Sequence, residues 1–190
     1  MTKDSGGQTA TVPGPSAWVS RWIGRPTGGA SLLDFACGSG RHVRTAVAAG
    51  YRVLAADRDG QALAEAGVAG AERVEVVEAD LEGGRWPFAG RRFEVVLLSR
   101  FLHRERLDLL LGLVAPGGRF IGETFARGNE QWGRPRNPAF LLAPDELFLA
   151  CRRAGLVVLA FEQGAVAGPS MIQRVAAIRP PFDPLAWPLA

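Results

Sequence analysis

Three carboxylates stand at or near the ends of three successive apolar segments, and the first is followed by a glycine turn. Asp34 comes shortly before Gly38 and Gly40, and Asp57 and Asp80 end the next two segments. Glycine lets the backbone turn sharply and approach a ligand closely. A helix that starts after such a turn points its free amide groups at the same ligand. The spacing predicts a ligand site made of backbone amides and acids.

The chemistry of that ligand follows from what the turn lacks. A dinucleotide-binding turn has the spacing G-x-G-x-x-G, and here the third glycine is replaced by Val43. An acid placed like Asp34 suits a cationic amine, and one placed like Asp57 accepts hydrogen bonds from both hydroxyls of a ribose. Asp80 falls beside the expected position of an adenine. The three acids predict a cofactor that carries positive charge and no phosphate.

Such a site requires a scaffold of alternating strands and helices, and the hydrophobic pattern predicts one. The predicted strands are residues 31–36, 52–56, 74–79, 93–98, 119–124, 156–161 and 172–178. The predicted helices are residues 41–49, 61–66 and 104–114, with a short one at 15–24 and another whose first turn holds Pro144.

Strand–helix alternation favours a parallel sheet covered on both faces, whose ligands bind at the carboxyl ends of the strands. A turn near residues 164–169 joins the last two strands and predicts an antiparallel last strand. The predicted fold is α/β and Rossmann-like, with a mostly parallel sheet of about seven strands. We expect one domain at residues 15–190, preceded by a disordered tail at residues 1–14.

The motifs resemble those of a known family. Residues 33–42, Leu-Asp-Phe-Ala-Cys-Gly-Ser-Gly-Arg-His, resemble the cofactor motif of class I S-adenosylmethionine-dependent methyltransferases. Asp57, Asp80 and the Pro-Gly-Gly turn at residues 116–118 fall where that family has its later motifs. Residues 137–147 are similar to the small bacterial methyltransferases of the tellurite-resistance type. Ala36 departs from the glycine of many members.

The resemblance covers about residues 30–178 and implies S-adenosylmethionine as the cofactor. It implies cofactor contacts at Asp34, Ala36, Cys37, Gly38, Gly40, His42, Asp57, Arg58, Asp80, Leu81 and Ser99. We interpret His42 as a packing residue beside the turn, and Cys37 as a small residue rather than a nucleophile.

Residues that face the methyl acceptor are expected after the fourth and fifth strands. Methyl transfer is an in-line displacement that mainly needs alignment, and it needs a base only when the acceptor atom loses a proton. His103 is the candidate base, since a histidine has an ordinary pKa of about 6.5, and a surface or helix-start histidine is the alternative. Arg100 is a candidate for an anionic group, or is a solvated arginine. The expected acceptor-side residues are Arg100, His103, Glu123, Trp132 and Arg136.

Two further segments bear on the acceptor. Residues 99–104, Ser-Arg-Phe-Leu-His-Arg, lack the Asn/Asp-Pro-Pro-aromatic motif of enzymes that methylate base amino groups or glutamine amides. The long loop that holds Trp132, Arg134 and Arg136 is predicted to be a lid over the acceptor pocket, with a plain surface loop as the alternative.

Composition excludes several classes of site. Lys3 is the only lysine among the 190 residues and lies in the predicted tail, which excludes a P-loop lysine and a Schiff base. The two cysteines and two histidines have no metal-binding spacing, so we expect no metal. The net charge of +3 comes from scattered arginines, which favours a solvated basic surface over a nucleic-acid patch. No apolar run approaches about 18 residues and no signal peptide opens the chain, so we expect a cytoplasmic protein without a membrane partner.

The leading hypothesis is a methyltransferase that acts on a small molecule, with an anion such as a metalloid oxyanion among the candidate acceptors. One alternative is an RNA methyltransferase that uses the basic surface. The other is a non-catalytic module that binds the cofactor and stabilises a partner. The oligomeric state cannot be predicted from the sequence.

Overall fold

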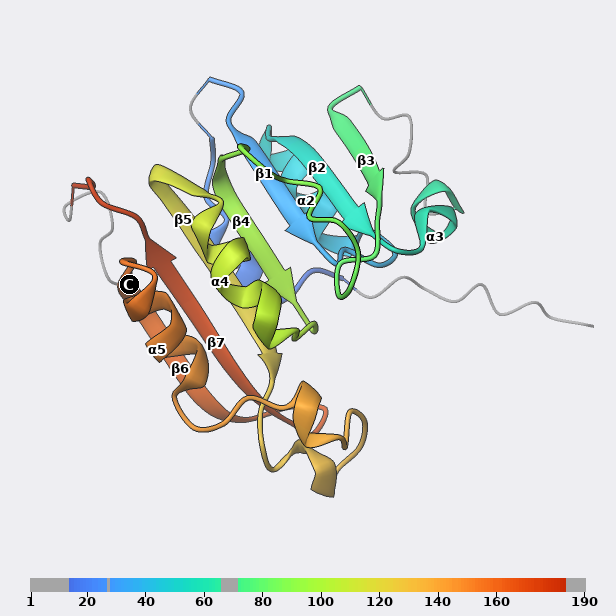
Figure 1. The fold of residues 1–190 in the computed structure, drawn as a ribbon, viewed down its shortest axis with the longest axis vertical. Helices are drawn as coiled ribbons and strands as arrows, with labels where there is room; N and C mark the ends of the chain where they lie inside the picture. The colour runs from blue at the N-terminus through green and yellow to red at the C-terminus, as the bar shows by residue number, and fades with distance from the viewer. Residues whose placement is uncertain (1–13, 27, 66–71, 184–190) are drawn as a thin grey trace, which may run out of the picture.

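A seven-stranded sheet organises the protein. The computed structural model describes residues 14–26, 28–65 and 72–183, so the predicted tail lies outside the described residues except for Gly14. The strand order is β3-β2-β1-β4-β5-β7-β6 (Figure 1). The strands are β1 (Ser31–Phe35), β2 (Arg52–Asp57), β3 (Val74–Glu78), β4 (Phe93–Ser99), β5 (Val114–Phe125), β6 (Val157–Val166) and β7 (Ser170–Ile178).

The pairing confirms the predicted topology. The strands from β3 to β5 pair in parallel, whereas β7 is antiparallel to both of its neighbours, β5 and β6. The chain order reverses between β1 and β4, which are adjacent in the sheet. Such a reversal opens a crevice at the carboxyl ends of the two strands, and ligands of open α/β sheets bind there.

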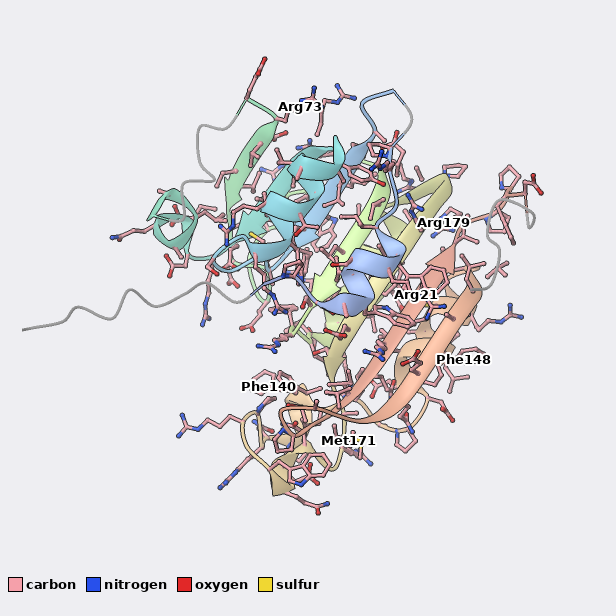
Figure 2. All side chains as sticks on the ribbon, turned by 180° about the vertical axis from the view of Figure 1, so that it is seen from behind. Arg21, Arg73, Phe140, Phe148, Met171 and Arg179 are labelled. Carbon is pink, nitrogen blue, oxygen red and sulfur yellow. The ribbon has the colours of Figure 1, made fainter. Side chains whose placement is uncertain are left out.

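Helices cover both faces of the sheet, as the alternation predicted (Figures 1 and 2). Helices α4 (Arg104–Gly112) and α5 (Glu146–Arg153) pack on one face through Leu107, Leu111 and Leu147. On the other face lie α1 (Ala17–Trp22), α2 (Arg41–Ala49) and α3 (Gly60–Glu65), whose buried residues include Trp18, Val19, Val43, Ala46 and Leu63. Because β1 and β4 lie between these two cores, they are nearly continuous apolar runs.

Strand β5 begins earlier than the sequence predicted. Pro116, Gly117 and Gly118 were expected to form a turn before the strand, but β5 starts at Val114 and runs through them. The register of the β4–β5 pair shifts between Phe93 and Val95, so the strand absorbs the glycines as an irregularity. A Cβ on Gly118 would lie 2.9 Å from two backbone carbonyl oxygens, so the close strand contact requires glycine there.

Two helix boundaries also differ from the prediction. Val114 was placed at the end of a helix and instead begins β5. Pro144 was placed in the first turn of a helix, but Asp145 has a left-handed φ of 59° and α5 therefore begins at Glu146. The Glu146 carboxylate accepts a hydrogen bond from the Ala143 amide at 2.7 Å and so satisfies a free donor beside the helix start.

None of the helices formed by the described residues is long and apolar enough to cross a membrane.

Candidate functional site

The turn after β1 has the backbone shape that its glycines predicted. Ala36, Gly38 and Gly40 have left-handed φ values of 58°, 52° and 70°, and α2 starts directly after Gly40. The Cys37 amide donates to the carbonyl of Ala56 at 3.1 Å, which ties the turn to β2. A Cβ built on Gly38 meets no atom within 4 Å, so this residue faces open space. The turn thus leaves room for a ligand against its backbone.

Two neighbouring cavities open at this turn, and we call them together the strand-end cleft. The first, of about 260 Å³, is lined by Asp34, Ala36, Cys37, Gly38, Ser39, Arg41, His42, Ser99 and Arg100. The second, of about 210 Å³, is lined by Ala36, Asp57, Arg58, Asp80, Leu81, Glu82, Arg100 and Phe101. Because both cavities include Ala36 and Arg100, they adjoin each other. The cleft brings together the three acids that the sequence selected, and among the predicted cofactor contacts only Gly40 does not line it.

Asp34 is the buried acid of the cleft. Its side chain is only 1% exposed, and Oδ2 has no hydrogen-bond partner. Burial raises the pKa of Asp34 to about 8, although the Arg41 guanidinium favours its ionised form. The free apoprotein therefore keeps this carboxyl mostly protonated near neutral pH, and a cationic group beside it stabilises the carboxylate.

Asp57 braces the glycine turn from the end of β2. Its Oδ2 accepts a hydrogen bond from the Gly38 amide at 2.7 Å, and its Oδ1 accepts one from the Asp59 amide at 3.1 Å. The sequence pointed to Asp57 as a ligand-binding acid but gave no sign of this second role. Each carboxylate oxygen has two lone pairs, so both contacts leave acceptor capacity toward the cleft.

Asp80 lines the second cavity of the cleft. Its Oδ1 accepts hydrogen bonds from the amides of Glu82 and Gly83, and these bonds lower the pKa of its carboxyl. Buried Leu81 and the ring of Phe101 line the same cavity and form its apolar wall among charged residues. An aromatic cluster supports that wall and consists of Phe35, Trp86, Phe88 and Phe101. Sequence reasoning missed Trp86 and Phe88, whose apolar rings in a loop were the available signal.

His42 is packed at the start of α2. Its side chain is 3% exposed, and Nε2 accepts a hydrogen bond from the Ser16 amide at 3.2 Å, just before α1. Burial lowers the pKa of His42 to about 4, and Arg41 and Arg100 add to the effect. The ring is neutral near pH 7, and the bond to Ser16 places its proton on Nδ1.

Two arginines give the cleft its positive end. An Nη of Arg41 donates to the Ser99 hydroxyl at 3.1 Å. Arg100 has a left-handed φ of 55°, an uncommon backbone conformation, and its amide donates to the carbonyl of Glu123 at 2.8 Å. Desolvation lowers the pKa of Arg41, and the charge of Arg100 lowers it further. Arg41 was not among the residues selected from sequence, although the motif contained it.

His103 and Glu123 lie beside the cleft without lining it. His103 precedes α4 and lines a small apolar cavity with Phe101, and its Nδ1 is buried without a partner. The Glu123 carboxylate is 3.8 Å from a guanidinium nitrogen of Arg174, and its charge raises the pKa of Arg41. Glu123 therefore acts on the cleft through electrostatics.

Trp132 and Arg136 belong to the segment between β5 and α5, residues 126–145, which we call the excursion. Both side chains are exposed and neither lines the strand-end cleft. In Figure 1 the excursion follows the end of β5 and lies at the edge of the sheet where the parallel strands end. In this structure the segment flanks that edge, and its role as a lid over an acceptor pocket stays a prediction.

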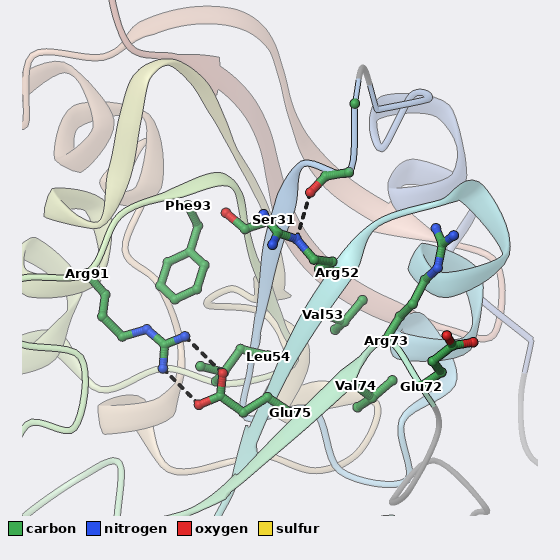
Figure 3. A pocket seen from close by; sticks show the side chains of 12 residues that line it. Ser31, Arg52, Val53, Leu54, Glu72, Arg73, Val74, Glu75, Arg91 and Phe93 are labelled. Carbon is green, nitrogen blue, oxygen red and sulfur yellow. Dashed lines mark hydrogen bonds and ion pairs between the residues drawn. The ribbon is translucent and has the colours of Figure 1, made fainter.

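A larger hollow of about 840 Å³ lies at the opposite end of the sheet (Figure 3). It is lined by the amino-terminal residues of β1 to β3 and by the ends of nearby loops. Its three arginines are bonded within the protein: Arg91 forms two hydrogen bonds with Glu75, and Arg52 and Arg73 donate to the carbonyls of Gly29 and Gly50. Ligands of such sheets bind at the carboxyl ends of the strands, so the smaller strand-end cleft is the candidate site. Within the described ranges, no cluster of three metal-ligating side chains is present.

Comparison with known proteins agrees with this choice. Residues 32–118 match the family model described as a methyltransferase domain. A curated relative, the demethylmenaquinone methyltransferase of Clavibacter sepedonicus, is 36% identical over 104 residues. That match covers 50% of this chain and 41% of the relative, so the chain spans about two fifths of that protein.

Solved structures show the same fold at low sequence identity. An S-adenosylmethionine-dependent methyltransferase from Mesorhizobium loti aligns with a TM-score of 0.65 and 19% identity, over 85% of this chain and 96% of that one. TehB from Haemophilus influenzae aligns with a TM-score of 0.62 and 16% identity, over 80% of this chain and 58% of that one. The predicted class of fold is confirmed, and residues 32–118 are similar to a methyltransferase domain.

Proposed function

We propose that this chain, which carries a class I methyltransferase domain, transfers the methyl group of S-adenosylmethionine to a small anionic acceptor. One observation carries the proposal. The strand-end cleft unites Asp34, Asp57 and Asp80 around a glycine turn that faces open space. A buried carboxyl oxygen without a partner lowers stability, so Asp34 in this cleft favours a role in binding a cationic ligand.

The residues of the cleft fit the cofactor group by group. The orphaned Oδ2 of Asp34 suits the ammonium of the methionine part, because a cation there offsets the cost of burying a carboxylate. Asp57 suits the ribose hydroxyls, and the apolar wall at Leu81 and Phe101 suits an adenine ring beside Asp80. When bound, S-adenosylmethionine supplies an electrophilic methyl group on a sulfonium.

Arg100 supports an anionic acceptor. Arg100 is exposed, lines both cavities and lies near Arg41. Paired guanidinium groups bind carboxylates and oxyanions in fixed orientations. Aligning the acceptor with the methyl group is worth roughly 7–11 kcal/mol of the barrier. Methyl transfer to an acceptor that the two arginines hold in place therefore does not require a general base. The resemblance of residues 137–147 to tellurite-resistance-type enzymes points in the same direction.

Isothermal titration calorimetry with S-adenosylmethionine, S-adenosylhomocysteine and NAD tests the cofactor. We expect the two adenosyl sulfur compounds to bind in the micromolar range and NAD not to bind. Binding of NAD, or of none of the three, would contradict the assignment of the cleft.

A second assay tests the acceptor. Purified protein with methyl-labelled cofactor is incubated with a panel of oxyanions, carboxylates, thiols and hydroquinones. We expect transfer to an anionic member, and Arg100→Gln should raise the KM for that acceptor more than it lowers kcat. Transfer only to neutral members would reject the anionic acceptor but keep the methyltransferase.

Two alternatives remain distinguishable by experiment. RNA methylation predicts RNA affinity that falls steeply with salt concentration, and transfer of label to RNA rather than to the small-molecule panel. A non-catalytic binding module predicts cofactor binding without turnover on any acceptor.

A further inference from the structure

The excursion presents aromatic and basic side chains together to solvent. Trp132 is 43% exposed and Phe140 is 44% exposed, and these are the two aromatic members of the large hydrophobic side chains exposed among the described residues. Arg127, Arg134 and Arg136 are exposed in the same stretch, and Glu130 is its one acidic residue, so the stretch is net positive. An exposed aromatic costs solvation free energy, so two of them in one stretch with three cations indicate an interaction surface.

A short 3₁₀ helix of the excursion, Pro138–Phe140, forms an apolar tip in which both backbone amides and two of the three carbonyls are hydrogen-bonded within the protein. All three of its residues are exposed. Asn137 accepts from the Ala139 amide through its side chain and from the Phe140 amide through its carbonyl, both at 3.0 Å. The Ala139 carbonyl accepts from Arg104 of α4 at 2.7 Å, and Pro138 has no amide hydrogen. A backbone whose polar groups are bonded internally can enter an apolar phase at low cost.

The excursion is held in place. Asn129 is buried, and its side chain donates to the carbonyl of Pro135 at 3.1 Å and accepts from the amide of Met171 on β7 at 3.2 Å. Figure 2 shows Phe140 and Met171 at the same end of the molecule. The excursion follows the end of β5 (Figure 1). A partner that binds the excursion therefore also lies near the edge of the sheet where the strand-end cleft opens.

We propose that residues 127–140 dock the protein on an anionic lipid bilayer. Trp132 and Phe140 enter the interfacial region, where amphipathic and aromatic rings are favoured, and the three arginines contact lipid phosphates. Docking needs no spanning helix. The inference goes beyond the proposed function and does not depend on it.

Lipid fits this surface better than single-stranded nucleic acid does. Bases stack on aromatic rings, and Pro138 and Ala139 offer none, although they are exposed beside Phe140. An interface of acyl chains and headgroups covers all three residues of the tip. The arginines of the stretch can bind the phosphates of lipids or of nucleic acid, so it is the apolar tip that favours lipid.

Vesicle co-sedimentation of the full chain tests the proposal. We expect binding to vesicles of phosphatidylcholine with phosphatidylglycerol, and much weaker binding to phosphatidylcholine alone. Arg134→Gln with Arg136→Gln should lower the partition coefficient for the anionic vesicles about 25-fold, at about fivefold per arginine. Trp132→Ser with Phe140→Ser should lower it at least about tenfold.

The chain offers matched controls of the same exposure. Arg152→Gln with Arg153→Gln removes two exposed arginines from α5, and Leu109→Ser with Leu149→Ser removes side chains that are 45% and 48% exposed. Both pairs should leave vesicle binding nearly unchanged, and thermal unfolding of each variant checks that it is folded. Absence of binding to anionic vesicles, equal losses in the control pairs, or binding to single-stranded RNA in place of vesicles would each overturn the proposal.

Discussion

Asp34 and Asp57 lie on adjacent strands, two register positions apart, yet their surroundings give them different chemistry. Asp34 pairs with Ala55 in the register of β1 and β2, and its carboxyl is buried without a partner for Oδ2. Asp57 is partly exposed and accepts two backbone hydrogen bonds. Burial therefore favours the neutral acid at Asp34, whereas Asp57 is bonded to the turn that it supports.

Cofactor binding should release about one proton from Asp34 near pH 7. The free protein holds the carboxyl protonated because its pKa is about 8, and the cofactor's ammonium favours the carboxylate. Cofactor affinity should therefore rise with pH up to about 8. Calorimetry in buffers of different ionisation enthalpy measures the proton, and Asp34→Asn should abolish the buffer dependence while Asp108→Asn, on the exposed face of α4, keeps it. A binding enthalpy independent of buffer in the parent protein would contradict this role.

Asp57→Ala should weaken cofactor binding by about 1.5–3 kcal/mol, the range for hydrogen bonds to a charged group. The substitution removes the expected ribose contacts and also frees the Gly38 amide. Titration calorimetry measures the change, with Asp108→Ala as the control. Unchanged affinity in the Asp57 variant would place the cofactor elsewhere.

At the scale of elements, the turn between β1 and α2 decides whether the cleft is open. Gly38 combines a left-handed φ with space in the direction of a side chain, so a side chain there is strained and also projects into the cleft. Gly90, in the connection between β3 and β4, has a φ of 76° and equally open surroundings but lines neither cavity.

Gly38→Val and Gly90→Val should therefore separate backbone strain from occlusion. Both should lower the free energy of unfolding by about 1–2 kcal/mol, the cost of a left-handed non-glycine residue. Only Gly38→Val should abolish cofactor binding. Chemical denaturation measures the first quantity and calorimetry the second, and loss of binding in both variants would show that strain alone explains it.

At the scale of the whole molecule, two buried titratable groups give stability a pH dependence of opposite sign. His42 has its pKa lowered from 6.5 to about 4, so the unfolded chain binds the extra proton between those values and stability rises with pH there. Asp34 has its pKa raised from 3.8 to about 8, so the folded protein holds the extra proton and stability falls as pH rises through that window. The two effects oppose each other from about pH 4 to 6.5.

Above about pH 6.5 only the Asp34 effect of this pair remains. The free energy of unfolding of the apoprotein should therefore fall between about pH 6.5 and 8, by at most about 1.4 kcal/mol per pH unit. Asp34→Asn should flatten this decline, and His42→Gln should leave it in place. Urea unfolding at a series of pH values measures the profile, and a decline that persists in Asp34→Asn would rule out this origin.

The sequence by itself determined the sheet, the faces that its helices cover and the strand-end acids. Hydrophobic periodicity and glycine position are local properties, and they placed each of the seven strands to within a few residues, although β5 and β6 are longer than predicted. The order of Asp34, Gly38, Asp57 and Asp80 along the chain was also enough to predict where the ligand site lies, because parallel strands end at one edge of the sheet.

Only the tertiary structure decided which side chains reach the cleft and in what state. Arg41 and Phe101 line it, whereas Trp132 and Arg136 do not. The course of residues 126–145 depends on contacts from Asn129 and Arg104 to distant segments, which no local pattern encodes. The pKa of Asp34 likewise depends on burial by residues far apart in sequence, since desolvation is set by the packed surroundings rather than by the residue itself.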